Sequence, residues 1–270
     1  MSPPDIAMIV PSFNSMGYLR RTLRSFYKYS PWLRFVVVDD ASTEWDPSVL
    51  DVVPPEQLTT HRFSKNGGLT RSWNKGYEIV ANMSDRPEYL IFGNNDILAN
   101  KHWWKGMVKT LESGAAMTGP LSNAAGVTAH GRQDIWNYIK DYKLTDDPAY
   151  LNKLSDTLFA RYCRDVNHTV RYEVNGFFMM GRTETFVKNE HSPGHIFVPN
   201  LKTMPSGRKN KTPLMTGQED ELQHRLRKRG LQSDIALGSF VFHYRSVARG
   251  GAYAKRGGKW LRCDDLDKGV

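Results

Sequence analysis

Short apolar runs alternate with amphipathic segments over the first hundred residues. Continuous apolar or β-branched runs occupy residues 6–10, 35–38 and 89–92, and runs of this length are typical of strands that are buried on both faces of a sheet. Between them, residues 15–30 and 68–82 repeat their apolar positions at helical spacing. This β-α-β-α-β order predicts a parallel sheet with right-handed crossovers.

The second half of the chain is less regular. Its apolar stripes and runs predict helices at residues 146–165 and 219–230 and strands at residues 171–182 and 234–246. Asp147 followed by Pro148 is a favourable helix start, and Gly230 is a favourable helix end. Residues 189–217 are rich in Pro, Gly, Asn and Lys, which predicts a mobile loop.

The composition is that of an ordinary globular protein. A chain of 270 residues, 40% hydrophobic and 24% charged, fits one large domain or two small halves that share a core. No apolar run approaches the ~20 residues needed to span a bilayer, and the N-terminus resembles neither a signal peptide nor a transit peptide. Cys163 and Cys263 form neither a disulfide framework nor a zinc motif, which predicts a reducing, cytoplasmic location.

The net charge of +9 is unevenly distributed. Residues 245–262 hold six Lys or Arg and no acid, and the segments 206–211 and 225–230 are also basic. Clustered charge of one sign attracts an anionic partner, such as nucleic acid, an anionic membrane surface or a phosphorylated small molecule. A basic face that serves only solubility is the alternative.

Polar segments follow each of the three predicted N-terminal strands. They read PSFN (11–14), DDAST (39–43) and GNNDI (93–97). Ligands of open α/β sheets bind beyond the carboxyl ends of the strands, so we expect these segments to form the functional site. The sequence has neither GxGxxG after its first strand nor GxxxxGK[ST], which argues against an ordinary dinucleotide fold and a P-loop enzyme.

Asp39, Asp40 and the Asn66-Gly67-Gly68 segment each allow two interpretations. The aspartates could form an Asx-type turn, or one of them could accept hydrogen bonds from a nucleobase or ribose. The Asn-Gly-Gly segment could be an ordinary loop, or it could open a helix whose N-terminus meets a diphosphate, with Arg71 adding positive charge.

Glu219, Asp220 and His243 are open in the same way. Carboxylates in the first turn of a helix are favourable with the helix dipole, but one of these two could also act as a general base at the mouth of the sheet. His243 ends an apolar strand, where it could be a packed core residue or a ligand for a divalent cation.

The order of these motifs resembles glycosyltransferase family 2, the inverting enzymes of the GT-A fold. Pro-x-Phe-Asn, Asp-Asp-Ala-Ser, Asn-Gly-Gly, Asn-Asn-Asp, Glu-Asp and a final His follow one another over roughly residues 5–250. The resemblance implies an α/β fold with a mostly parallel, Rossmann-like sheet flanked by helices and a smaller acceptor-side region. It divides the domain into a nucleotide-sugar-binding half (1–100), an acceptor-binding and catalytic-base half (101–244) and a basic C-terminal tail (245–270).

The resemblance also implies a reaction in which a hexosyl or pentosyl group moves from a nucleotide sugar to an acceptor hydroxyl. Asp220 would be the general base and Glu219 would support it. The nucleotide would contact Pro11, Phe13, Asn14, Asp39, Asp40, Asn66, Gly67, Gly68, Arg71, Asn94 and Asn95. The basic loop 206–211 would hold or cover the diphosphate.

A divalent cation, Mn²⁺ or Mg²⁺, is the cofactor that the resemblance implies, with Asp96 and His243 as its protein ligands. Asn94 stands where many family members carry a first aspartate. With one carboxylate at this motif, we expect weak binding of free metal and tighter binding once the donor diphosphate supplies further oxygens.

Neither the sugar nor the acceptor follows from the resemblance. A glycan, a lipid-linked sugar or a protein is the usual acceptor class in the family, and the basic charge adds a modified base in DNA as an alternative acceptor. Such a base would need to be flipped out to reach Asp220. A non-catalytic nucleotide-sugar binder or a nucleotidyltransferase remains the alternative of another class.

Overall fold

The computed structural model of the protein describes residues 2–125, 132–213 and 217–244, together with the backbone of residues 253–256 and 259–262. Most of the predicted basic tail, Cys263 included, lies outside the described residues. Among the described helices, none is both long and apolar enough to span a membrane.

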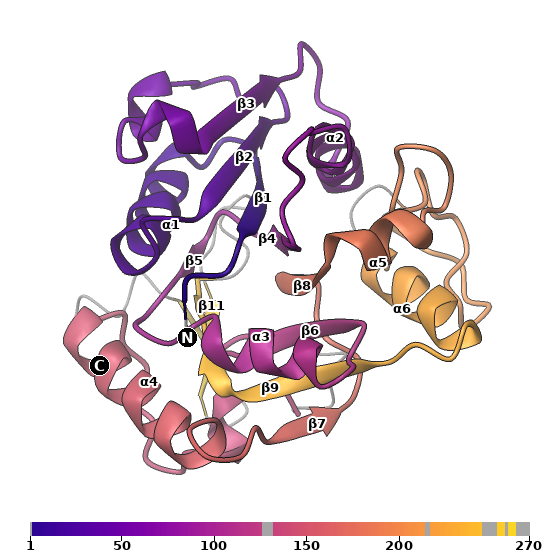
Figure 1. Cartoon of the computed structure of the whole chain (residues 1–270). Coiled ribbons are helices and arrows are strands. Elements are labelled where there is room, and N and C mark those ends of the chain that lie inside the picture. Colours follow the sequence, from indigo (N-terminus) through magenta and orange to yellow (C-terminus); the bar gives the residue numbers. More distant parts are fainter. Residues whose placement is uncertain (1, 126–131, 214–216, 245–252, 257–258, 263–270) are drawn as a thin grey trace.

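An eight-stranded sheet runs through the molecule in the order β3-β2-β1-β4-β8-β6-β9-β7 (Figure 1). Its strands are β1 (Ile6–Ser12), β2 (Arg34–Asp39), β3 (Leu58–Arg62), β4 (Tyr89–Gly93), β6 (Met117–Leu121), β7 (Thr169–Arg171), β8 (Phe178–Arg182) and β9 (Ser233–Phe240). The first four of these in spatial order pair in parallel, as predicted for the N-terminal half. Beyond β4 the pairing is mixed: β8 is antiparallel to both of its neighbours, β6 and β9 are parallel, and β7 is antiparallel.

The helices cover both faces of this sheet (Figure 1). They are α1 (Met16–Tyr29), α2 (Leu69–Ala81), α3 (Lys105–Glu112), α4 (Pro148–Tyr162), α5 (Thr183–Lys188) and α6 (Gln218–Lys228), with 3₁₀ turns at Pro47–Leu50, Pro55–Gln57 and Ile135–Asn137. As predicted, Asp147 caps α4, because its side chain accepts hydrogen bonds from two backbone amides of the first turn. Gly230 follows α6 with φ of +74°, a conformation that glycine adopts without strain.

Alternation along β1 explains why helices are needed on both sides. Ile6, Met8 and Val10 belong to the core that contains α1, whereas Ala7 and Ile9 belong to the core that contains α2. All five side chains are buried. A strand that is apolar at every position can be buried only between two layers, and a continuous apolar run encodes this arrangement.

Two predicted strands are broken in the structure. The segment 171–182 is divided between β7 and β8, and residues 172–177 between them leave the sheet. The segment 234–246 is divided at Val241 between β9 and a short strand, β10 (Phe242–His243). The prediction of single strands was wrong in both cases because an apolar run does not reveal where a chain changes partners.

Two small sheets complete the described fold. Strand β10 pairs antiparallel with β5 (Ile97–Leu98), so that His243 lies opposite Ile97. Strands β11 (Tyr253–Arg256) and β12 (Lys259–Arg262) pair antiparallel with each other. The first of these pairings brings the end of β9 back to the end of β4.

The contact between α2 and β1 gives a test of this packing. An alanine Cβ at Gly76 would lie 2.3 Å from Cγ2 of Ile9. We expect Gly76→Ala to lower the free energy of unfolding by about 1–3 kcal/mol through overpacking, measured by urea denaturation at constant m value. In the control Gly17→Ala, nothing lies within 4 Å of the added Cβ, so stability should be unchanged or slightly raised; equal losses in both variants would contradict the close packing.

Candidate functional site

The three polar segments that follow β1, β2 and β4 are tied to one another, as the strand-end rule predicted. Asn14, with φ of +48°, accepts a hydrogen bond from the amide of Thr43 through Oδ1 at 2.8 Å. Asn95 donates from Nδ2 to Oγ of Ser15 at 2.5 Å and to Oγ of Ser12 at 3.4 Å. The carboxyl ends of these strands therefore form one connected polar surface.

Asp39 binds other residues of this polar surface. Its fully buried carboxylate accepts hydrogen bonds from the amide and hydroxyl of Ser42 and forms an ion pair with Arg62 at 3.1 Å. This is the turn-forming alternative for Asp39, reinforced by a cation. Its contact with a nucleobase remains a prediction.

Asp40 is bound by the segment that was predicted to meet a diphosphate. Its carboxylate accepts hydrogen bonds from the amides of Gly67 at 3.0 Å and Gly68 at 2.6 Å, and from Nη2 of Arg71 at 2.6 Å. The Arg71 guanidinium also lies 3.7 Å from the ring centre of Phe63. The amides and the guanidinium thus form an anion-binding site at the start of α2, and an anion of the chain itself occupies it.

The remaining nucleotide candidates differ in exposure. Pro11 is buried within β1, whereas Phe13 is half-buried and Asn14 is exposed. Asn94 is half-buried. Asn66 is part of the Asp40 site, since its Nδ2 donates to the Asp40 carbonyl oxygen at 3.2 Å. Of the PSFN segment, only the last two side chains therefore offer surface to a ligand.

Asp96 and His243, the two predicted metal ligands, lie side by side. Both are buried, and Nε2 of His243 is 3.3 Å from Oδ1 of Asp96. The pairing of β5 with β10 brings them together, supported by a hydrogen bond from the Tyr244 amide to the Asp96 carbonyl oxygen at 2.9 Å.

The hydrogen bonds of His243 determine which of its two ring nitrogens carries the proton. Nδ1 is 2.8 Å from the carbonyl oxygen of Ala124, and because a carbonyl can only accept, Nδ1 carries the proton. In a neutral imidazole the Nε2 lone pair then faces Oδ1 of Asp96 and also Nδ2 of Asn94, which lies 3.4 Å away and can donate to it. Oδ1 of Asp96 has no hydrogen-bond partner in the described part of the chain. A nitrogen and an oxygen lone pair that face the same space fit a divalent cation, and the Nδ1–H to carbonyl bond is the usual support of a histidine ligand.

Asn123, which the sequence reasoning missed, holds His243 in place. It exchanges two hydrogen bonds with the His243 backbone, accepting from its amide at 2.8 Å and donating to its carbonyl at 3.0 Å. The ring of Phe177 stacks on the imidazole at a centroid distance of 4.9 Å and an interplanar angle of 14°. Backbone position and ring orientation of His243 are therefore both fixed.

Glu219 and Asp220 lie in the first turn of α6. Glu219 contacts Gly176, which directly precedes Phe177: an added Cβ at Gly176 would lie 3.0 Å from the Glu219 carboxyl carbon. The carboxyl group is enclosed and accepts hydrogen bonds from the backbone of Gly176 and Gly217, although the residue as a whole is only half-buried. Gly176 and Phe177 therefore link Glu219 to His243 through neighbouring residues, and Asp220 follows Glu219 on α6.

Burial changes the acidity of both carboxyl groups. Desolvation, and secondarily the negative charge of Asp220, raises the pKa of Glu219 to about 7. Desolvation, and then Glu173, raises the pKa of Asp220, whereas Arg227 and Arg208 oppose the rise. The basic loop 206–211 lies by the start of α6, since the Met204 amide binds the Arg208 carbonyl oxygen at 2.9 Å and the Met204 side chain packs against Gly217. Two neighbouring carboxyl groups with raised pKa values are typical of a site for proton transfer.

The described residues contain no group of three or more His, Cys, Asp or Glu side chains that could hold a metal ion. Among these residue types, Asp96 and His243 would therefore offer a cation two ligands within the described part of the chain. This arrangement fits the expectation that a ligand must supply further oxygens.

Comparison with known proteins identifies the family. A family model described as Glycosyl transferase family 2 matches residues 7–176, which is more than half of the chain. The chain belongs to this family. No curated protein matches the sequence.

Solved glycosyltransferase structures share the fold. TarS of S. aureus is similar at 16% identity and a TM-score of 0.52, over 88% of this chain and 60% of its own. GalNAc-T7 with UDP, GalNAc and Mn²⁺ is similar at 15% identity and a TM-score of 0.61, over 90% and 44%. The mannosyltransferase PcManGT from Pyrobaculum calidifontis, in complex with GDP-Man and Mn²⁺, is similar at 14% identity and a TM-score of 0.55, over 95% and 59%.

These similarities confirm the predicted GT-A fold. At such identities they show the fold alone. The family 2 chain spans between 44 and 60% of the length of the three structures, so it corresponds to part of each.

The pKa of Glu219 predicts how stability depends on pH. Because its folded pKa of about 7 lies above the ordinary value of 4.5, the stability that the protonated group contributes is present below pH 4.5 and is lost as pH rises through 7. Glu219→Gln cannot ionise, so its unfolding free energy relative to wild type should rise by on the order of 1–3 kcal/mol between pH 4.5 and 8.

Denaturant titrations at several pH values measure this difference, with Glu184→Gln as a matched control. Glu184 also lies in the first turn of a helix, but it is exposed and its pKa is lowered by Lys188. The control should show no such rise. A pH-independent difference for Glu219→Gln would show that Glu219 is ionised in the folded protein throughout this range.

Proposed function

We propose that the protein transfers a sugar from a nucleotide-sugar donor to an acceptor hydroxyl with inversion of configuration at the anomeric carbon. One observation carries the proposal: Asp96 and His243 lie side by side beyond the parallel strand β4, and the segment that stacks on His243 through Phe177 also contacts Glu219 through Gly176, next to Asp220, and both of these carboxyl groups have a raised pKa. The family membership supports it, as do the nucleotides, sugars and Mn²⁺ named for GalNAc-T7 and PcManGT.

The donor would bind across the ends of β1, β2 and β4. Phe13 and Asn14 offer exposed surface for the base and ribose, and Asn94 and Asn95 offer amides for the ribose and phosphate side. The amides of Gly67 and Gly68 and the Arg71 guanidinium already bind one anion, Asp40. The diphosphate would reach these donors when the carboxylate moves aside.

Asp96 and His243 would hold a divalent cation through Oδ1 and Nε2. When bound, such a cation acts as a Lewis acid that neutralises charge on the departing diphosphate. Asn123, Phe177 and Ala124 keep the imidazole in its orientation and tautomer.

Asp220 would act as the general base. It removes the proton of the acceptor hydroxyl while that oxygen forms a bond to the anomeric carbon, and the bond to the diphosphate breaks with its electron pair. A single displacement of this kind inverts the configuration. Glu219 supports this role, because its raised pKa lets it bind a proton near neutral pH beside an ionised Asp220.

The remaining alternatives for the function differ in the acceptor molecule, or in having no acceptor at all. Glycans, lipid-linked sugars and proteins, and a modified base in DNA, all present a hydroxyl to the same base. A nucleotide-sugar binder without catalysis would share the donor site but would not require Asp220.

Replacing Asp220 tests the proposal. Asp220→Asn keeps the shape of the side chain but removes the base, so the transfer rate should fall by about 10²- to 10⁴-fold while donor affinity stays within about 2-fold. The rate is measured as sugar transfer, or as donor hydrolysis in a screen of nucleotide sugars. Glu112→Gln, an exposed carboxylate at the end of α3, is the control; wild-type transfer by Asp220→Asn would remove Asp220 from its role.

Metal titration tests the proposed cation site of Asp96 and His243. We expect weak Mn²⁺ binding by the free protein, at least 10-fold tighter binding with UDP or GDP present, and loss of that gain in Asp96→Asn. Isothermal titration calorimetry measures the three affinities, and Glu112→Gln should behave as wild type. Tight Mn²⁺ binding without nucleotide would contradict a site that depends on donor oxygens.

A further inference from the structure

Helix α1 presents a row of basic side chains that the donor site does not use. Arg20, Arg24 and Lys28 follow one another at intervals of four residues, and Arg21 lies beside the first of them. All four are exposed, and α1 contains no acidic residue. With a rise of 1.5 Å per residue, the row places a positive charge about every 6 Å along the helix.

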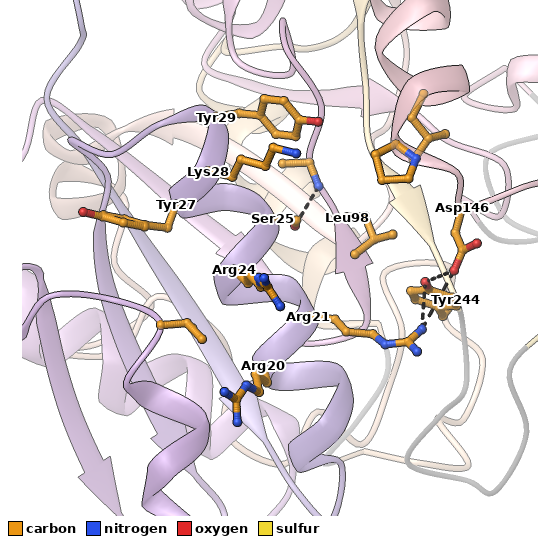
Figure 2. Close-up of a pocket in the computed structure, with 14 residues that line it drawn as sticks. Arg20, Arg21, Arg24, Ser25, Tyr27, Lys28, Tyr29, Leu98, Asp146 and Tyr244 are labelled. Atoms are coloured by element: carbon orange, nitrogen blue, oxygen red, sulfur yellow. Dashed lines mark hydrogen bonds and ion pairs between the residues drawn. The ribbon is translucent and has the colours of Figure 1, made fainter.

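The basic row borders a groove of about 880 Å³. Figure 2 shows α1 with its arginines on one side and Leu98, Asp146 and Tyr244 on the other. Apolar side chains from β5, from α4 and from the segment after the first 3₁₀ turn also line it, namely Leu98, Ala99, Val52 and Leu151. Tyr27 and Tyr29 complete the lining on α1.

The charges of this groove are not balanced. Asp146 is the acidic member of its lining, and it lies 3.9 Å from Arg21 and hydrogen-bonds to the Tyr244 hydroxyl. Arg20, Arg24 and Lys28 form no ion pair within 4.0 Å with any carboxylate of the described residues. Three cations in a row, beside an apolar floor, are complementary to a ligand with repeated negative charges and flat apolar groups.

Tyr244 is the lining residue of the groove that lies next to the candidate site in the chain. Tyr244 directly follows His243, and its amide binds the carbonyl oxygen of Asp96. A chain-like ligand that lies along α1 would have to extend past Tyr244 to reach Asp96 and His243, which do not themselves line the groove. A small anion would use one of the basic side chains and would gain nothing from the others.

We infer that this groove binds a single-stranded segment of nucleic acid and that this strand carries the acceptor. A strand offers one phosphate per nucleotide for the basic row and a base for stacking on tyrosine, which is the usual combination in single-strand binding. A polyanion without bases would use the row but not the aromatic lining. The role as acceptor rests on the proposed function, whereas binding of the strand does not.

The first test measures binding of a fluorescein-labelled oligodeoxynucleotide of twelve thymidines by anisotropy at several salt concentrations. In the triple variant Arg20→Gln, Arg24→Gln, Lys28→Gln, three phosphate contacts are lost. Each contact on a single strand contributes about 0.7 to the slope of log K against log salt, so the slope should fall in magnitude by about 2. Glutamine maintains helix propensity, and the thermal unfolding midpoint checks the fold.

A matched triple variant controls for net charge. The variant Arg161→Gln, Arg164→Gln, Lys228→Gln removes three exposed charges that do not line the groove. The slope of log K against log salt should change by less than about 0.7, the contribution of one phosphate contact. An α1 variant that binds like this control would overturn the proposal, even if the protein still binds the oligonucleotide elsewhere.

The second test separates a nucleic-acid strand from a polyanion without bases. Tyr29→Leu should weaken oligonucleotide binding roughly 10-fold with an unchanged salt slope, as expected for lost stacking. Tyr29→Phe should keep the affinity, because it retains the ring and loses only the hydrogen bond with Asn152. Equal losses in both variants, or equal competition by inorganic polyphosphate at matched charge, would overturn the assignment to nucleic acid.

Donor hydrolysis by the α1 variant distinguishes this inference from the proposed function. We expect unchanged hydrolysis together with weakened strand binding, because the row lies outside the donor site. If Asp220→Asn retains full transfer while the α1 row is needed for binding, the catalytic proposal fails and the binding groove stands. If Asp220 is needed and the α1 row is not, only the groove is refuted.

Discussion

The two parts of the central sheet are held together by the pairing of strand β8. It pairs antiparallel with β4 on one side and β6 on the other, and so connects the parallel N-terminal strands to the C-terminal part of the sheet. Its entry is fixed by a hydrogen bond from the Asn94 amide to the Phe177 carbonyl oxygen at 2.9 Å. Residues 176 and 177, just before the strand, touch Glu219 and stack on His243. A strand that joins the two halves therefore also joins the carboxylates of α6 to the lone pairs of Asp96 and His243.

The sequence predicted the strands that are buried on both faces of the sheet. Strands β1, β2 and β4 are continuous apolar runs because both of their faces are covered, and their ends located the polar segments of the site. Strand β3 was missed because Leu58–Arg62 is only half-buried and contains no apolar run. Strand β6 was missed because Met117–Leu121 contains Gly119 and Pro120, which weaken a strand pattern although every position is buried.

The missed strand explains the missed site residue. Asn123 follows β6 by two positions, so the rule that selected the ends of the other strands would have selected it too. The ion pair of Asp40 with Arg71 was beyond any local pattern, because it joins residues that are 31 positions apart. Which nitrogen of His243 carries a lone pair also depends on a distant carbonyl, that of Ala124. Sequence patterns predicted the polar residues of the candidate site, and tertiary contacts decide their partners and protonation.

At the start of α2, the carboxylate of Asp40 competes with any dissolved anion for the donors of the anion site. It is tethered to the same loop system, so its effective concentration at the Gly67 and Gly68 amides is far above that of any dissolved anion of low affinity. Inorganic phosphate must displace it with a few hydrogen bonds alone. Under the proposed function, a nucleotide held by its base and ribose would meet the same competitor with its diphosphate at a comparable effective concentration. The tethered carboxylate would thus make this anion site select ligands by what else the anion is attached to.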